Sequence, residues 1–275
     1  MQALRHFLLA VQFFSRIPVT GRLAAWVGWS PALQRASAAH LPGVGWLVGL
    51  WGALWLLVLA WWLGASAWMP LVAALGSTAA TLALTGAFHE DGLADVADGL
   101  GGHLPPERAL EVMKDSRVGA YGVMALVVAL GSKVALLALL IDLHPPLAAV
   151  LLLSAHVLSR LAPLVLMRWL PYVGLQAQSK TLHVAGIQLP TRGLCIGIAW
   201  CLPVAVLAAA LCDQGLWVLG GMVAAAALVV GGLGHRLRRR LGGMTGDCLG
   251  ACQQLTELAL LLAASGLVLR MGLAA

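Results

Sequence analysis

Residues 88–121 read FHEDGLADVADGLGGHLPPERALEVMKDSRVGAY, and they hold seven of the eleven carboxylates in the chain. The stretches on either side, residues 67–88 and 120–141, are almost entirely apolar. An acid-rich segment between apolar runs of membrane-spanning length divides the chain into parts that a bilayer can hold and a part that it cannot. Polar chemistry is therefore expected within or beside residues 88–121.

Composition places the whole chain in a membrane. Of its 275 residues, 61% are hydrophobic and only 10% are charged, and the mean hydropathy is +0.91. Ordinary soluble domains carry about 25% charged residues. A membrane-spanning helix needs about 20 mostly apolar residues, and about seven runs qualify: residues 43–63, 67–88, 120–141, 147–169, 193–211, 216–233 and 253–271. We expect a single membrane domain over residues 1–275.

The predicted fold is all-α, a polytopic integral membrane bundle of about seven transmembrane helices. In lipid every backbone N–H and C=O group must be satisfied within its own segment, and the runs lack the alternating pattern of barrel strands. Residues 1–22 form a short amphipathic segment with Phe7, Val11 and Phe14 on one face. We expect it to lie at the membrane interface as a retained helix, with residues 20–40 as a loop.

Basic residues collect in alternate connections between the predicted spans, which places them on one side of the membrane. They are Arg108, Lys114, Arg117, Arg168, Lys180, Arg192, Arg236, Arg238, Arg239 and Arg240. By the positive-inside rule this side is cytoplasmic, so residues 88–121 would face the cytoplasm from the cell inner membrane. The net charge of +6 then reflects topology and contact with anionic lipid, and we expect no nucleic-acid binding.

Three aspartates within residues 88–121 have helical spacing. If the helix of the preceding span continues to residue 100, Asp91, Asp95 and Asp98 recur at i, i+4 and i+7 and share one face. Carboxylates in this arrangement suit Mg²⁺, which completes its shell with water and substrate phosphates. The alternative is a solvated acidic helix end. Glycines that would let a ligand approach the backbone lie nearby: Gly92, Gly99, Gly101 and Gly102.

Basic side chains accompany these acids. Arg108, Lys114 and Arg117 follow a Pro-Pro pair and would supply counter-charges for a diphosphate. A surface network of ion pairs is the alternative. Lys133 and Arg160 lie inside predicted spans, where a charge marks either a functional site or a pairing with a carboxylate that serves structure alone.

A second polar segment, the predicted site loop at residues 234–257, repeats the chemistry of the first. Glycines surround Thr245 and Asp247 beside a run of arginines, and Glu257 lies a few turns further along the chain. Both polar segments are predicted on the same membrane face. We therefore expect them to converge on one divided site.

Three segments, FHEDGLADVADGL, MKDSRVGAYGVMAL and LGGMTGDCLGA, resemble the signature segments of the cobalamin synthase family, the adenosylcobinamide-GDP ribazoletransferases. The resemblance runs in order over nearly the whole chain. It implies a Mg²⁺-dependent membrane enzyme in which a hydroxyl of α-ribazole, or of its 5′-phosphate, attacks the cobinamide-side phosphorus of adenosylcobinamide-GDP. GMP leaves, and adenosylcobalamin or its 5′-phosphate is formed.

The resemblance also implies site residues. The family pattern maps onto His89, Asp91, Gly92, Asp95, Asp98, Asp115, Arg117, Gly119, Lys133, Thr245, Gly246, Asp247 and Glu257. On this basis Asp91, Asp95 and Asp98 would hold Mg²⁺ on the diphosphate. Asp247 or Asp115 would complete the metal site or position the hydroxyl.

All the remaining positions of the pattern except Gly119 are expected to contact substrate. They are His89, Gly92, Arg117, Lys133, Thr245, Gly246 and Glu257, together with Arg160, and of these Arg117, Lys133 and Arg160 would neutralise the departing GMP phosphate. The sequence departs from the family at Glu90, where an apolar residue is frequent, and at Gln254, where a carboxylate is expected. Residues 172–180 also lack the family's usual loop residues.

Other functions share parts of this pattern. A CDP-alcohol phosphotransferase or a membrane prenyltransferase would also bind Mg²⁺ and a diphosphate. A cation transporter would place carboxylates or broken helices at the bilayer midplane, whereas here the acids gather at one predicted face. The sequence is also compatible with a homo-oligomer.

Overall fold

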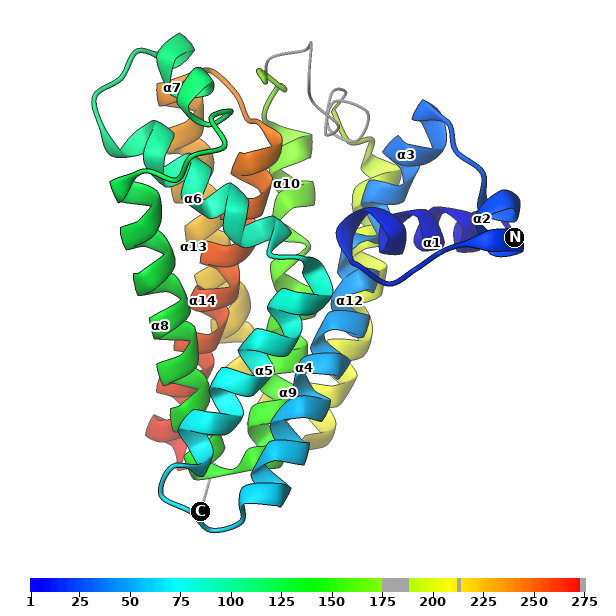
Figure 1. The fold of residues 1–275 in the computed structure, drawn as a ribbon. Helices are drawn as coiled ribbons and strands as arrows, with labels where there is room; N and C mark the ends of the chain where they lie inside the picture. Colours follow the sequence, from blue (N-terminus) through cyan, green and yellow to red (C-terminus); the bar gives the residue numbers. More distant parts are fainter. Residues whose placement is uncertain (175–187, 212–213, 273–275) are drawn as a thin grey trace.

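The computed structural model describes residues 1–174, 188–211 and 214–272, and within these ranges the chain is a bundle of α-helices without β-strands (Figure 1). The long helices are α4 (Leu41–Leu63), α5 (Met69–Thr85), α8 (Ala120–Leu143), α9 (Pro145–Ser159) followed by α10 (Ala162–Trp169), α12 (Thr191–Leu211), α13 (Gly215–Leu241) and α14 (Gly246–Met271). Among the described residues six segments are long and apolar enough to cross a membrane, and a bent pair of helices raises the number to seven. The predicted polytopic helical bundle is confirmed.

The second polar segment is mostly helical, which differs from the loop predicted at residues 234–257. Helix α13 continues to Leu241, and α14 begins at Gly246, so the connection is only four residues long. Gly242 ends α13 in the left-handed conformation with φ 76°, and the hydroxyl of Thr245 accepts a hydrogen bond from the backbone N–H of Cys248 to cap α14. Polar residues at helix ends need no loop to keep them out of the apolar core.

The N-terminal region contains α1 (Gln2–Phe14), α2 (Gly21–Val27), α3 (Pro31–Ser37) and the short 3₁₀ helix η1 (Ala38–His40). Helix α1 lies across the long helices and buries Leu9, Val11 and Phe14 against them (Figure 1). The predicted loop at residues 20–40 is therefore wrong, since Pro31 and the capping hydroxyl of Ser30 start a helix there.

A sharp bend separates α5 from α6 (Phe88–Gly101). Gly86 and Ala87 both take the left-handed conformation, with φ of 68° and 56°, and the two helices meet at 90°. The expectation of one continuous helix through residue 100 is wrong, because left-handed residues cannot continue a right-handed helix. The bend lays α6 across the end of the bundle (Figure 1).

Helix α6 then crosses the start of α14 at two glycines. A Cβ atom added to Gly92 would lie 2.7 Å from the carbonyl oxygen of Asp247, and one added to Gly250 would lie 3.0 Å from that of His89. The two backbones are therefore in direct contact. Gly99 and Gly101 are likewise filled by protein, against Met113 and the ring of Tyr121, so these glycines serve packing and do not leave open backbone for a ligand.

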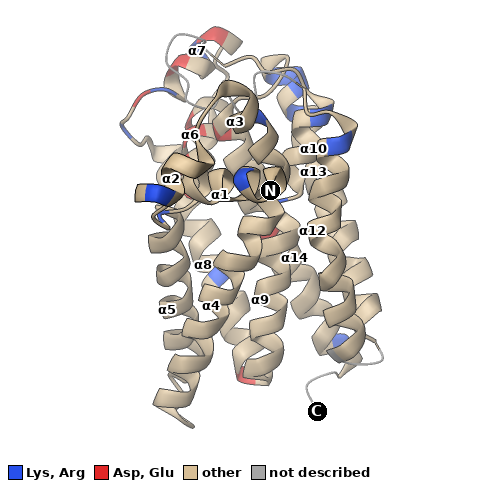
Figure 2. Cartoon of the chain, turned by 90° about the vertical axis from the view of Figure 1, so that its right-hand side faces the viewer, with Lys and Arg blue, Asp and Glu red and all other residues tan. Residues whose placement is uncertain are grey.

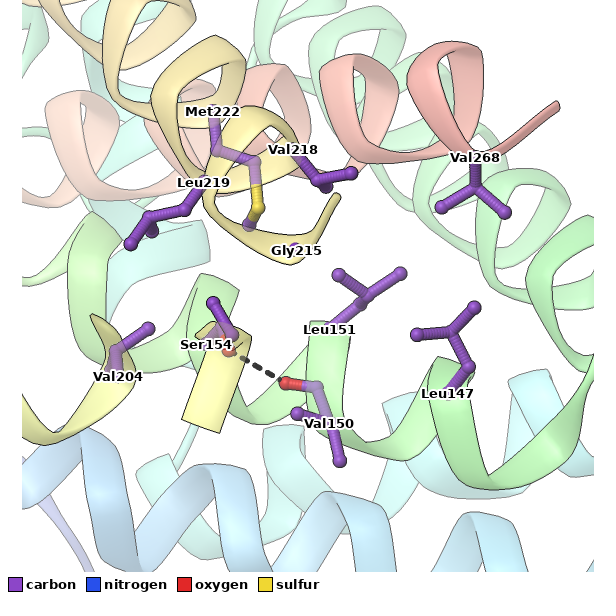
Figure 3. A pocket seen from close by; sticks show the side chains of 11 residues that line it. Leu147, Val150, Leu151, Ser154, Val204, Gly215, Val218, Leu219, Met222 and Val268 are labelled. Carbon is purple, nitrogen blue, oxygen red and sulfur yellow. Dashed lines mark hydrogen bonds between the residues drawn. The ribbon is translucent and has the colours of Figure 1, made fainter. Parts of the chain in front are cut away.

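The charged side chains collect at the end of the bundle where α6 lies, and the spans are almost free of them (Figure 2). A small cavity of about 30 Å³ between α9, α12, α13 and α14 has aliphatic walls, and its one hydroxyl, on Ser154, donates to the carbonyl of Val150 (Figure 3). A space of this size and chemistry does not hold a charged substrate.

The bend makes a stability prediction. Ala87→Val adds a β-branched side chain at positive φ and is expected to destabilise the protein by about 1–2 kcal/mol, whereas Ala87→Gly removes the strain and is expected to be at least as stable as the natural chain. Thermal unfolding in detergent, followed by circular dichroism, measures both. Ala83→Val, at an exposed helical position of α5, is the matched control. Equal losses at positions 83 and 87 would contradict the assigned bend.

Candidate active site

Three carboxyl side chains from two helices meet at the crossing of α6 and α14, and we call Asp91, Asp95 and Asp247 the acidic cluster. Asp91 and Asp95 stand on α6, and Asp247 lies in the first turn of α14. Burial, followed by the charges of Asp247 and Asp91, raises the pKa of the Asp95 carboxyl to about 7. Like charges held this close favour a bound cation, because each carboxylate destabilises the ionised form of its neighbour.

Lys114 is the protein's own counter-charge at this cluster. It follows α7 (Pro106–Val112), and its Nζ lies 2.9 Å from Oδ2 of Asp247. Burial alone would lower the pKa of Lys114, but the carboxylate of Asp247 outweighs burial and the pKa is raised. The side chain is 36% exposed, so the ammonium group is charged and accessible from the surface.

Thr245 and Gly246 place Asp247. The Thr245 hydroxyl lies 3.3 Å from Oδ2 of Asp247 as well as capping α14, and Gly246 is the first residue of the helix. A carboxylate in the first turn is stabilised by the unpaired N–H groups and the positive end of the helix dipole. The predicted substrate contacts of Thr245 and Gly246 remain predictions.

Asp98, the third aspartate of the predicted face, has a different partner. Its carboxylate accepts hydrogen bonds from the backbone N–H groups of Gly119, at 2.7 Å, and Gly122, at 2.8 Å. These groups open α8, so Asp98 fastens the end of α6 to the start of that helix. Both glycines lack a Cβ where the carboxylate approaches. Asp98 therefore serves as a helix anchor, and its predicted metal contact remains untested.

Asp115 and Arg117 pair with each other. Nη2 of Arg117 lies 2.6 Å from Oδ2 of Asp115, and these hydrogen bonds lower the pKa of the Asp115 carboxyl to about 2. The Arg117 side chain is 87% exposed. Arg108 similarly pairs with Glu111 at 2.6 Å on the surface. The alternative of a surface ion-pair network thus describes these residues, and Lys114 alone of the three predicted basic residues contacts the acidic cluster.

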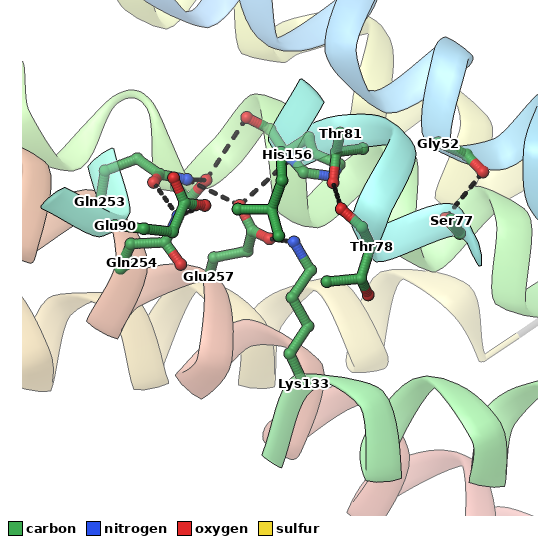
Figure 4. Close-up of polar contacts among 12 residues, drawn as sticks. Gly52, Ser77, Thr78, Thr81, Glu90, Lys133, His156, Gln253, Gln254 and Glu257 are labelled. Carbon is green, nitrogen blue, oxygen red and sulfur yellow. Dashed lines mark hydrogen bonds and ion pairs between the residues drawn. The ribbon is translucent and has the colours of Figure 1, made fainter. Parts of the chain in front are cut away.

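Beneath the acidic cluster, α6, α8, α9 and α14 share a second group of polar residues (Figure 4). We call it the buried polar cluster, and it consists of Glu90, Lys133, His156, Arg160, Gln253, Gln254 and Glu257, all buried. Glu257 lies at its centre. Nζ of Lys133 is 2.6 Å from Oε1 of Glu257, and His156 Nδ1 and Gln253 Nε2 are 3.1 Å and 2.7 Å from Oε2.

Arg160 is enclosed in the same cluster. Its Nη1 donates to the carbonyl of His156 at 2.8 Å and lies 4.0 Å from Oε2 of Glu257, and the side chain is 2% exposed. Lys133 and Arg160 thus have protein partners, as in the structural alternative for charges inside spans. Neither side chain is accessible to a phosphate in this structure, so their predicted contact with departing GMP receives no support.

Two of the departures from the family pattern, Glu90 and Gln254, contact each other. Nε2 of Gln254 donates to Oε1 of Glu90 at 2.8 Å and to Oε1 of Gln253 at 2.8 Å, which connects α6 to the buried polar cluster. His89, predicted to contact substrate, is buried, and neither of its ring nitrogens has a hydrogen-bond partner in the described chain. Of the departures at residues 172–180, positions 175–180 lie outside the described residues.

The acidic cluster fits a cation that arrives with a substrate. Among the described residues no group of three or more His, Cys, Asp or Glu side chains is arranged to hold a metal ion. Mg²⁺ commonly takes one or two carboxylates and completes its shell with substrate phosphates and water. Burial first, and the charges of Asp247 and Asp91 second, raise the pKa of Asp95, and a cation bound by these hard oxygen donors would offset both effects.

Sequence reasoning underrated three residues. Lys114 was expected only as one of several phosphate counter-charges, although its place in MKDSR is the one that reaches Asp247. His156 and Gln253 were not singled out at all. Both are polar residues inside predicted apolar runs, and that is the signal that identifies them as members of an internal network.

Comparison with known proteins gives the family. The family described as cobalamin-5-phosphate synthase matches residues 6–265. An adenosylcobinamide-GDP ribazoletransferase of Polaromonas naphthalenivorans is 51% identical over 272 residues, covering 94% of this chain and 96% of that protein. A protein of the same name from Vibrio cholerae is 40% identical over 253 residues, covering 92% of this chain and 90% of its own length.

No solved structure shows significant similarity to the chain. The family match extends over more than nine tenths of the sequence and includes both helices that build the acidic cluster. The chain therefore belongs to the cobalamin-5-phosphate synthase family.

Proposed function

We propose that this chain is a membrane-bound adenosylcobinamide-GDP ribazoletransferase, which joins α-ribazole or its 5′-phosphate to adenosylcobinamide-GDP and releases GMP. The observation that carries this proposal is the meeting of Asp91, Asp95, Asp247 and Lys114 at the polar end of a chain that is 51% identical to an enzyme of that name. Carboxylates for a cation beside an ammonium for a phosphate are the groups that a diphosphate substrate requires.

The reaction sets the task for these residues. A new bond forms between the ribazole hydroxyl oxygen and the cobinamide-side phosphorus, and the bond from that phosphorus to the oxygen of the GMP phosphate breaks. The hydroxyl proton is released, and GMP keeps the electron pair. Such a transfer needs little covalent chemistry from the protein, so positioning and neutralisation of charge account for most of the acceleration.

Each residue of the site has a role in this scheme. Asp91, Asp95 and Asp247 would bind Mg²⁺ only together with the diphosphate oxygens of the substrate, and the ion when bound would neutralise charge on those oxygens. Lys114, whose Nζ lies 2.9 Å from Oδ2 of Asp247, would donate to a phosphate oxygen. Asp247 fits the role that the sequence left open between it and Asp115, because the charge of Asp247 acts on Asp95, whereas Asp115 pairs with Arg117 at the surface.

We assign the buried polar cluster a positioning role. It fixes α6 and α14 against α8 and α9 directly below the acidic cluster, through Gln254 to Glu90 and through Glu257 to Lys133. In an apolar environment each of these contacts is strong, and an unpaired partner is costly. The crossing that brings the aspartates together is therefore held in one arrangement.

The site is proposed to face the cytoplasm from the cell inner membrane. Supporting this placement, Arg236 and Arg240 at the end of α13 donate to the carbonyls of Leu100 and Gly102 at the end of α6, at 3.3 Å and 3.0 Å. The basic segment and the acidic cluster thus share one end of the bundle, and the positive-inside rule assigns that end to the cytoplasm.

Replacing Asp95 tests the metal assignment. Asp95→Asn is expected to reduce Mg²⁺-dependent GMP release from adenosylcobinamide-GDP and ribazole by about 100-fold or more. The variant loses the negative charge that would hold Mg²⁺ at the reacting diphosphate. Chelation with EDTA is expected to abolish release by the natural chain, and added Mg²⁺ to restore it. The assay uses purified protein in lipid. Glu107→Gln, at an exposed position of α7, is the control and should turn over normally. Normal turnover by Asp95→Asn would refute the assignment.

The buried ion pair makes a separate prediction. Lys133→Met and Glu257→Gln are each expected to lower the stability of the detergent-solubilised protein by about 3–5 kcal/mol, since each leaves a buried charge uncompensated. The double variant should lose less than the sum of the two single losses. Thermal unfolding of the four proteins measures this coupling. Strictly additive losses would show that the two side chains do not interact.

A further inference from the structure

A cavity with basic residues on its walls lies away from the acidic cluster. It is bounded by α1, α3, η1 and the start of α12, and its volume is about 670 Å³. The ionisable residues on its walls are His6, Arg35, His40 and Arg192, and the described lining includes no carboxylate. Leu189 and Ile196 contribute apolar wall. The cavity therefore places charged and neutral hydrogen-bond donors beside aliphatic side chains. These groups suit a ligand that has an anionic head and an apolar tail.

Arg35 and Arg192 are the two arginines of this cavity. Neither Arg35 nor Arg192 makes an ion pair or a side-chain hydrogen bond within the described residues. Another basic cavity, of about 700 Å³, lies between the ends of α6 and α13 and is lined by Arg236, Arg239 and Arg240. There Arg236 and Arg240 donate to backbone carbonyls of the α6 terminus. As far as the described chain goes, the side-chain donors of Arg35 and Arg192 are left for a ligand.

The ring of His40 is fixed in one tautomer. The indole Nε1 of Trp200 donates to Nδ1 of His40 at 3.1 Å, so the neutral ring carries its proton on Nε2. Trp200 is itself held, because Phe7 stacks on it at 5.2 Å and Trp46 donates to its carbonyl at 2.9 Å. His40 is thereby a preset hydrogen-bond donor in the wall of the cavity.

The position of the cavity identifies the class of ligand. Helix α1 is amphipathic and lies across the bundle. The membrane-spanning helix α12 begins at Thr191, so Arg192 lies in its first turn. This is the level at which lipid headgroups meet the ends of spans. The volume is well above that of an inorganic phosphate, and the apolar wall suits glycerol and the first acyl carbons.

We propose that this cavity binds the phosphate headgroup of an anionic glycerophospholipid, with Arg35, Arg192 and the Nε2–H of His40 as its donors. Basic pockets between transmembrane helices are suited to such headgroups. The site shares no residue with the acidic cluster, and so it is a lipid site additional to the proposed active site.

The test measures binding of short-chain lipids to the full chain in detergent by native mass spectrometry. The probes are dihexanoyl phosphatidic acid, dihexanoyl phosphatidylcholine and inorganic phosphate. The natural chain is expected to prefer phosphatidic acid over both others. The double variant Arg35→Gln/Arg192→Gln is expected to bind it about 30-fold more weakly, because two headgroup charges lose their partners.

Two further variants keep the test specific. Arg239→Gln removes a charge from the other basic cavity at the same end of the bundle and should leave binding unchanged. Ala36→Trp fills the cavity without changing charge and should weaken binding. If Arg239→Gln weakened the binding of phosphatidic acid as much as the double variant does, the effect would come from the overall positive charge and not from this cavity. If the natural chain bound inorganic phosphate as tightly as phosphatidic acid, the lipid assignment would be refuted. Either result overturns the proposal.

Discussion

The structure depends on one backbone contact, where α6 crosses the start of α14 at Gly92 and Gly250. Without side chains at these points the helices approach until the carbonyl oxygen of Asp247 lies where a Cβ of residue 92 would be. Only at this separation do aspartates from α6 share their surroundings with Asp247. The proposed chemistry therefore depends on two glycines that are assigned no contact with a ligand. The close approach of α6 and α14 at these glycines brings the charges of the acidic cluster together and contributes to the raised pKa of Asp95.

Such a crossing brings like charges together, so the rest of the bundle must hold it closed. The 90° bend at Gly86 and Ala87 directs α6 across the bundle, and Asp98 fastens its other end to the start of α8. Below the crossing, the buried polar cluster connects four helices around Glu257. Burying ions is costly unless each is paired. Here the pairing joins elements far apart in sequence, which gives the arrangement its specificity.

The sequence predicted the fold class, the spans and the acidic segment, because apolar length and the position of charges are local properties. It did not predict what depends on partners far along the chain. The helical spacing of Asp91, Asp95 and Asp98 suggested one common face, but the bend and the N-terminus of α8 give Asp98 another partner. Likewise Lys133 carried an intramembrane charge without an identifiable partner, and its contact with Glu257 is formed only by tertiary packing.

The divided metal site is tested most directly by Mn²⁺ electron paramagnetic resonance on protein in lipid, with GDP as a soluble diphosphate. Mn²⁺ bound by the natural chain is predicted to show coupling to phosphorus. Asp91→Asn and Asp247→Asn, on different helices, should each weaken Mn²⁺ binding about 10-fold or more. Glu107→Gln should bind as the natural chain does. Unchanged Mn²⁺ binding by Asp247→Asn would contradict a site shared between α6 and α14.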